Sequence, residues 1–294
     1  MSMDAISLKN LAKYYGKDRG VIDLNLTVKK GEFFGFIGPN GAGKSTTIRL
    51  LLGLIAPTSG TISIFGRPLS DNLEAILSDA GYLPSEVFFY PGMKVRDVLK
   101  LSADLRGKNC LAAARSLCER LKLDMDRKVE DLSFGNRKKA AIVCALQHNP
   151  SLLILDEPTS GLDPLMQKEF FRILQERNDE GVTILLSSHI LSEVQQYCSR
   201  AAILRQGRIV ACGQMEQLMY TSAKKVMVNG QIDLKSSGEV QNLQQNKDTS
   251  TFLYYGTIQN LLSILQNGVV KDFTVTEPDL EEIFLHFYER EEAA

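Results

Sequence analysis

Residues 38–46 read Gly-Pro-Asn-Gly-Ala-Gly-Lys-Ser-Thr, and this segment constrains the fold more than any other part of the chain. An apolar run at 33–37 precedes it, and apolar residues recur at helical spacing over 46–54 after it. A strand, a glycine-rich loop and a helix in this order are typical of a nucleotide-binding loop. We therefore predict that the loop binds the phosphate groups of a nucleotide.

The residue types in this loop suit a phosphate site. Its glycines allow the unusual backbone angles and the close approach with which backbone N–H groups surround a polyanion. Lys44 adds a positive charge for the β- and γ-phosphates, and Ser45 offers a hydroxyl to Mg²⁺, which prefers hard oxygen ligands. The N-terminus of the following helix adds a favourable dipole. We expect nucleotide contacts from Gly38, Pro39, Asn40, Gly41, Ala42, Gly43, Lys44, Ser45 and Thr46.

Two carboxylates and a histidine follow later apolar runs. Asp156 and Glu157 come directly after the run 152–155, which is typical of a central strand covered on both faces. His189 ends the next strand pattern, and ligands of open α/β sheets bind where strands end. We predict that Asp156 holds Mg²⁺ through water, and that Glu157 orients and deprotonates the water that attacks the γ-phosphate. His189 would donate a hydrogen bond to that phosphate or that water.

Composition and charge narrow the classes of partner. The chain has 294 residues, of which 44% are hydrophobic, enough for one large domain and a small one. A formal net charge of −1 gives no general attraction to nucleic acid or anionic lipid, so we expect no nucleic-acid partner. The five cysteines form no Cys-x-x-Cys pair, and the apolar runs are too short to span a bilayer. We therefore expect a soluble chain that reaches a membrane only through a protein partner.

Periodicity divides the chain into two parts. Strand and helix patterns alternate to about position 213, with an antiparallel patch near the N-terminus and a mostly helical insert at about 86–148. We predict a nucleotide-binding domain over 1–220 and a smaller α/β domain over 221–294. Within the second domain we expect strands at 226–232, 251–255 and 269–275, a polar connection at 235–250, and helices at 258–266 and 279–288.

Two aromatic features allow alternative interpretations. Tyr15 precedes a turn glycine, and its ring either stacks on an adenine or covers the edge of a sheet. The unusually apolar segment 87–90, Val-Phe-Phe-Tyr, is either part of the core or an exposed patch for a partner.

Taken together, these motifs resemble the nucleotide-binding subunits of ATP-binding cassette (ABC) transporters, along roughly 3–220. Residues 132–136, Leu-Ser-Phe-Gly-Asn, are similar to the signature motif of that family, whose commonest form is Leu-Ser-Gly-Gly-Gln. The resemblance implies that Ser133, Gly135 and Asn136 contact the γ-phosphate of ATP held by the opposite subunit. Two sites would then form in a head-to-tail dimer, either of this chain with itself or with a related subunit.

The resemblance also implies roles for single residues, in the order in which the family has them. The loop 38–46 matches the Walker A motif, and the residue that follows Gly-Tyr-Leu-Pro is usually a glutamine, the Q-loop. This chain has Ser85 and then Glu86 there. The sequence leaves open whether Glu86 makes the contact with Mg²⁺ or water that the glutamine usually makes. The remaining matches are Tyr15 for adenine stacking, Asp156 for the Walker B aspartate, Glu157 for the catalytic base, Asp163 for the D-loop and His189 for the switch histidine.

The implied fold is α/β, a P-loop NTPase of the ABC type. It would have a mixed central sheet, an antiparallel β patch, a helical insert and a small C-terminal α/β domain. The implied activity is ATP hydrolysis with Mg²⁺ that powers a separate integral-membrane permease. The subunit would be cytoplasmic and peripheral, on the inner face of the cell membrane.

The C-terminal segment bears on the direction of transport. Residues 274–284, Thr-Val-Thr-Glu-Pro-Asp-Leu-Glu-Glu-Ile-Phe, are similar to the C-terminal extension of ATPase subunits that serve drug and antibiotic exporters. This resemblance implies an exporter. The alternative is a mechanical ATPase of the same superfamily that acts on ribosomes or DNA. We favour it less, because the chain has one cassette and neither a heptad run nor a Cys-x-x-Cys motif.

Overall fold

The computed structural model describes residues 3–219, 224–232, 239–246 and 248–276. The chain divides into two compact units, Met1–Gly213 and Gln214–Ala294, which we describe separately. The sequence pattern places this change a little later, near position 220. The expected helix at 279–288 lies outside the described residues, as does 277–284 of the segment that resembles exporter subunits.

A six-stranded sheet forms the centre of the first unit, with strand order β10-β9-β3-β8-β7-β6. The pairs β6–β7, β7–β8, β3–β8 and β3–β9 are all parallel. Every residue of β3, β7 and β8 is buried, as expected of parallel strands that are covered on both faces. The strands are β3 (Phe33–Ile37), β6 (Ala80–Leu83), β7 (Leu152–Asp156), β8 (Thr183–Ser188), β9 (Arg200–Arg205) and β10 (Arg208–Gln214).

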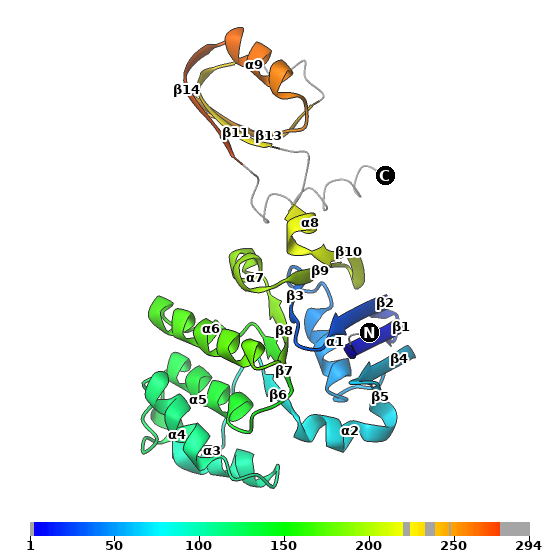
Figure 1. The fold of residues 1–294 in the computed structure, drawn as a ribbon, viewed down its shortest axis with the longest axis vertical. Coiled ribbons are helices and arrows are strands. Elements are labelled where there is room, and N and C mark those ends of the chain that lie inside the picture. The colour runs from blue at the N-terminus through cyan, green and yellow to red at the C-terminus, as the bar shows by residue number, and fades with distance from the viewer. Residues whose placement is uncertain (1–2, 220–223, 233–238, 247, 277–294) are drawn as a thin grey trace. The chain divides into compact units, whose positions relative to one another are not determined.

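A second, antiparallel sheet of the first unit has the order β2-β1-β4-β5. The helix α1 (Lys44–Leu51) lies between the two sheets (Figure 1). Its Ile48 and Leu50 are buried in one apolar cluster with Phe34 and Phe36 of β3 and Leu24 of β2. Packing between two sheets therefore fixes the direction of the helix that starts at the glycine-rich loop. The strands are β1 (Asp4–Tyr15), β2 (Asp18–Lys29), β4 (Ser59–Ile64) and β5 (Arg67–Pro68).

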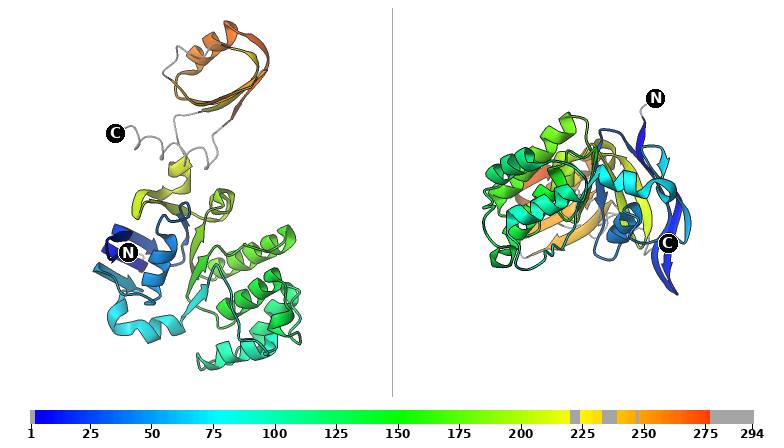
Figure 2. Two further views of the ribbon diagram at one scale, coloured as in Figure 1. Left: turned by 180° about the vertical axis from the view of Figure 1, so that it is seen from behind. Right: turned by 90° about the horizontal axis from the view of Figure 1, so that it is seen from below.

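The expected helical insert is present between β6 and β7. Figure 2 shows its helices on one side of the six-stranded sheet and β1, β2 and β4 on the other. Arg120 of α4 forms ion pairs with Glu169 (2.7 Å) and Glu176 (2.5 Å) of α6, which join the insert to the helix after β7. The helices of the unit are α2 (Leu69–Ser78), α3 (Val95–Asp104), α4 (Leu111–Arg120), the 3₁₀ turn Val129–Asp131, α5 (Phe134–Leu146), α6 (Pro164–Asp179) and α7 (Leu191–Tyr197).

Gly35 lies in the middle of β3, where α7 packs directly on the strand. A Cβ at Gly35 would lie 2.2 Å from Val194 Cγ1 and 3.1 Å from Ala201 Cβ. We expect Gly35→Ala to lower the free energy of unfolding by about 1–3 kcal/mol, the usual result of overpacking a core. Denaturant unfolding of the two proteins measures the difference. An unchanged midpoint would mean that α7 does not approach β3 this closely.

The second unit contains a four-stranded antiparallel sheet of order β12-β13-β11-β14 and the helix α9 (Ile258–Gln266). Val226, Phe252 and Tyr254 of the sheet form a small core with Leu261 and Leu265 of α9. The expected strands and the helix at 258–266 are confirmed. The elements are α8 (Met215–Met219), β11 (Lys224–Gln231), β12 (Val240–Gln245), β13 (Thr249–Tyr254) and β14 (Val269–Thr276).

The prediction of a polar connection over 235–250 is wrong for its second half. Residues 240–245 form β12, which pairs with β13. β12 lies at the end of the strand order, where one edge pairs with no other strand of the described residues. Edge strands tolerate polar side chains, because the backbone ladder rather than an apolar face holds them. Because its composition is polar, the sequence pattern did not predict this strand.

Candidate active site

The glycine-rich loop follows β3 at the carboxyl edge of the parallel strands, and α1 begins at its Lys44. Gly41 has φ +80° and Gly43 has φ +109°, in the left-handed region that side chains disfavour. Gly38 has no room for a side chain, since a Cβ there would lie 2.7 Å from the Leu204 carbonyl oxygen. The loop can therefore hold its backbone close to a ligand only with glycine at these positions.

The loop lines a pocket of about 340 Å³ together with residues that are distant in the sequence. Ser85 follows β6 and Glu157 follows β7, as the parallel order predicts. The sequence analysis did not identify Arg19 and Gly20, because only the pairing of β1 with β2 brings this hairpin to the loop. The lining residues are Tyr15, Arg19, Gly20, Pro39, Asn40, Gly41, Gly43, Lys44, Ser45, Thr46, Ser85 and Glu157.

Lys44 is buried, and its ammonium group points back along the loop. Its Nζ donates to the carbonyl oxygens of Gly38 (2.5 Å) and Pro39 (3.2 Å) and lies 3.7 Å from Glu157 Oε1. Burial lowers the pKa of Lys44, while the charges of Glu157 and Asp156 oppose this shift. A buried cation beside a glycine-rich loop is suited to bind a polyanion such as a chain of phosphates.

Asp156 and Ser45 present a pair of hard oxygen atoms. Asp156 accepts hydrogen bonds from Ser45 Oγ (3.2 Å, at Oδ2) and from Ser187 Oγ (3.1 Å, at Oδ1). Burial raises the pKa of Asp156, and the two serine hydroxyls oppose that shift. Among the described residues, no group of three or more His, Cys, Asp and Glu side chains could enclose a metal ion. The Ser45–Asp156 pair nevertheless fits Mg²⁺, which usually keeps waters and phosphate oxygens as its other ligands.

Glu157 directs a carboxylate into the pocket from a strained backbone. Its φ of +49° is left-handed, and its N–H donates to the Ser187 carbonyl oxygen at 2.9 Å. Its Oε2 shares a hydrogen bond with His189 Nδ1. Its buried Oε1 has no hydrogen-bond partner within the described part of the chain. That oxygen can therefore accept a hydrogen bond or a proton from a water molecule.

The segment that carries His189 is held by a residue that the sequence analysis missed. Ser188 Oγ donates to Glu193 Oε2 at 2.9 Å and accepts from the Ile190 N–H at 2.9 Å. Glu193 lies on α7, and burial raises the pKa of its carboxyl group. A glutamate two residues into a short helix carries no motif, so only the packing of α7 against β3 reveals this contact.

The residues of the signature-like motif do not line this pocket. Ser133 caps α5, with its Oγ accepting from the Asn136 N–H at 3.3 Å. Gly135 lies against the loop after β7, since a Cβ there would be 2.5 Å from the Gly161 carbonyl oxygen. Asp163 similarly caps α6, with its Oδ1 accepting from the N–H groups of Leu165 and Met166 at 3.1 and 3.0 Å. The structure thus brings these residues near each other but outside the site of their own chain.

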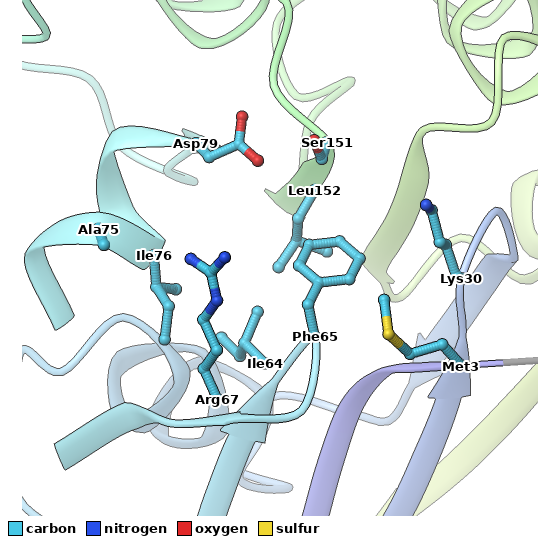
Figure 3. Close-up of a pocket in the computed structure, with 10 residues that line it drawn as sticks. All are labelled: Met3, Lys30, Ile64, Phe65, Arg67, Ala75, Ile76, Asp79, Ser151 and Leu152. Carbon is cyan, nitrogen blue, oxygen red and sulfur yellow. The ribbon is translucent and has the colours of Figure 1, made fainter. Parts of the chain in front are cut away.

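A different pocket, of about 190 Å³, lies at the opposite edge of the sheet (Figure 3). Ser151 and Leu152 mark the start of β7 there, and Asp79 directly precedes β6. Ligands in open α/β sheets bind at the carboxyl ends of the strands rather than at this edge. The position of the pocket therefore separates it from the candidate active site.

The loop pocket and the fold match known proteins. Residues 21–160 match the ABC transporter family. The chain is 35% identical over 292 residues to the uncharacterized ABC transporter ATP-binding protein YhaQ of Bacillus subtilis (strain 168), covering 95% of this chain and 97% of that protein. The chain belongs to the ATP-binding proteins of ABC transporters.

Another relative and a solved structure agree with this assignment. The bacitracin transport ATP-binding protein BcrA of Bacillus licheniformis is 40% identical over 223 residues, which cover 75% of this chain and 71% of BcrA. A structure of an ATP-binding subunit of an ABC transporter matches with a TM-score of 0.70 and 33% identity, over 73% of this chain and 91% of the other. The expectation of an ABC-type fold is confirmed, and this ABC protein is an ATPase.

The relatives also favour a transporter subunit over the mechanical ATPase that we considered as an alternative. Within the described residues, no helix of this ABC protein has both the length and the apolar character that crossing a membrane requires.

Proposed function

We propose that this ABC protein hydrolyses ATP in the loop pocket and thereby powers a separate membrane permease that exports its substrate. The observation that carries the proposal is the convergence of Lys44, Asp156, Glu157 and His189 at the carboxyl edge of one sheet. The similarity to a bacitracin transport protein supports a role in transport. The C-terminal segment that resembles exporter subunits supports export.

Each residue of the pocket has a proposed task. The loop 38–46 and Lys44 bind the phosphates, and the Tyr15 ring, 45% exposed at the rim, stacks on the adenine. Ser45 and Asp156 would hold Mg²⁺, which, when bound, neutralises charge that develops on the phosphates. Glu157 Oε1 takes the proton of the attacking water, and His189 holds the other oxygen of that carboxylate.

A second subunit would complete the site. Ser133, Gly135 and Asn136 lie outside the pocket of their own chain, and the exposed Ser133 begins a helix whose N-terminus suits an anion. We infer that these residues bind the γ-phosphate held by the opposite subunit. A dimer of this chain with itself and a dimer with a related subunit both satisfy this arrangement.

The segment 87–90 is the proposed contact with the permease. It is an exposed patch rather than core, with Phe88 85% and Tyr90 75% exposed. The segment borders a groove of about 610 Å³ whose mostly apolar lining suits a helix or loop of a membrane protein. Binding there would place the subunit at the cytoplasmic face of the membrane. The groove is lined by Glu86, Val87, Phe88, Phe89, Pro91, Val129, Glu130, Phe134 and Arg137, so Glu86 faces the groove and Ser85 the nucleotide pocket.

We expect Phe88→Asp to abolish co-purification of the permease without unfolding the protein, because it adds a charge to an exposed apolar side chain. The measurement is an affinity pull-down from solubilised membranes. The matched control is Leu105→Asp, since Leu105 is 77% exposed but does not line the groove. Permease binding that survives in Phe88→Asp would rule out this groove as the contact.

The function as a whole is tested with Glu157→Gln protein and ATP, which should keep the dimer closed. The protein is pulled down gently from solubilised membranes, and every co-purifying chain is identified by mass spectrometry. Recovery of a protein with several membrane spans, in stoichiometric amount, supports the transporter. Recovery of ribosomal or DNA-repair proteins alone would overturn it in favour of a mechanical ATPase.

A further inference from the structure

Lys138 is a buried charge in the first unit that none of the assigned roles uses. It lies on α5, and its side chain is only 1% exposed. Its Nζ donates to three backbone carbonyl oxygens, those of Pro84 (2.9 Å), Ser85 (3.1 Å) and Glu157 (3.0 Å). Three acceptors match the three hydrogens of one ammonium group, so the group is fully satisfied.

This arrangement is unusual for a lysine, because lysine is almost never fully buried unless it is paired. Burial lowers the pKa of Lys138 to about 8, and the charges of Asp156 and Glu157 oppose the shift. The three carbonyl acceptors favour the ammonium form, which has three hydrogens to donate. A buried charge that contacts only main-chain oxygens fixes the positions of those backbones, since each bond to a charged donor is stronger than a neutral one.

One of these backbones belongs to Glu157, whose φ of +49° is costly for a residue with a side chain. The residue is held from two sides, because its N–H donates to Ser187 and its carbonyl oxygen accepts from Lys138. With both peptide groups fixed, the carboxylate is directed toward the pocket, with Oε1 at 3.7 Å from Lys44 Nζ.

We propose that Lys138 is a positioning residue for hydrolysis, which holds Glu157 in the orientation that serves the attacking water. The same ammonium group ties Glu157 to Ser85, at the end of β6, and to α5, which begins beside Ser133. These contacts link the helix that starts at Ser133 to Ser85 and Glu157 through one side chain. This inference rests on the proposed role of Glu157 as the base.

The test replaces Lys138 with Met, which has a similar length but no hydrogen-bond donor. We expect kcat for ATP hydrolysis to fall about 100-fold, the size of effect that a misplaced reacting group produces. The affinity for ATP should change less than about threefold, because the three hydrogen bonds of Lys138 go to residues outside the glycine-rich loop. Lys138→Arg keeps a charged donor and should recover part of the lost kcat. The control is Lys168→Met, at an exposed position of α6.

A double-mutant cycle separates positioning from general structural damage. Single-turnover hydrolysis is measured for the parent, Glu157→Gln, Lys138→Met and the double variant, after circular dichroism has shown that each is folded. If Lys138 acts through the carboxylate, Lys138→Met lowers the rate in the parent but by less than about threefold in the Glu157→Gln background. An equal loss in both backgrounds, or a loss of ATP affinity in place of kcat, overturns the proposal.

The two proposals fail in different ways. A Glu157→Gln protein with the turnover of the parent would refute the role of Glu157 as the base, whatever Lys138 does. A strongly impaired Glu157→Gln protein combined with a fully active Lys138→Met protein would refute only the role of Lys138. If Lys138→Met does not fold, Lys138→Gln takes its place in the cycle, and the same criteria decide.

Discussion

Replacing Glu157 with Gln is expected to lower the turnover of ATP by roughly 100- to 10,000-fold, the range typical of the loss of a general base. The amide keeps the size of the side chain but cannot accept the proton of the attacking water. ATP binding should survive, because the loop 38–46 and Lys44 are unchanged. Steady-state hydrolysis and equilibrium binding of ATP measure the two quantities on the same protein.

The matched control is Glu180→Gln, which makes the same chemical change at the exposed end of α6. Its turnover should equal that of the parent. A Glu157→Gln protein whose turnover stays within a few-fold of the parent would place the base elsewhere, with His189 the next group to substitute because it contacts the same carboxylate.

Lys44→Ala should weaken ATP binding itself by about 10- to 100-fold, because a hydrogen bond to a charged group contributes roughly 1.5–3 kcal/mol. The fold should persist, since the contacts of Lys44 with Gly38 and Pro39 are local to the loop. Turnover falls as well, since the lysine also neutralises charge on the phosphates during hydrolysis.

Calorimetric titration with ATP in the presence of Mg²⁺ measures this loss, and Lys168→Ala on the exposed face of α6 serves as its control. An ATP affinity equal to that of the parent would contradict the assignment of the glycine-rich loop as the phosphate site. The outcome also differs from that expected for Glu157→Gln, which should impair hydrolysis but not binding.

Short-range patterns identified most of the first unit. The loop 38–46 could be assigned because a strand, glycines in order and a helix are contiguous in the chain. The structure gives a reason for each glycine, a positive φ at Gly41 and Gly43 and a close contact at Gly38. Asp156 and Glu157 could be placed because a strand buried on both faces is a continuous apolar run. β12 was missed, because an edge strand needs neither an apolar run nor alternation to pair.

The exposure of 87–90 could not be decided from the sequence. Four apolar residues in a row fit a core as well as a surface, and burial depends on what else packs there. The structure leaves Phe88 and Tyr90 exposed beside a groove that residues of the 3₁₀ turn and α5 help to form.

The sequence by itself determined the family, and it predicted the phosphate loop and the roles of Asp156, Glu157 and His189, because each lies at or directly after a strand pattern that is local in the chain. Only the tertiary structure decided how these groups meet: Glu157 between Lys44 and His189, and Ser187 on Asp156. It also revealed Lys138, whose three acceptors follow the ends of two different strands, β6 and β7. Such contacts depend on how helices pack against strand ends, and no single stretch of sequence specifies that packing.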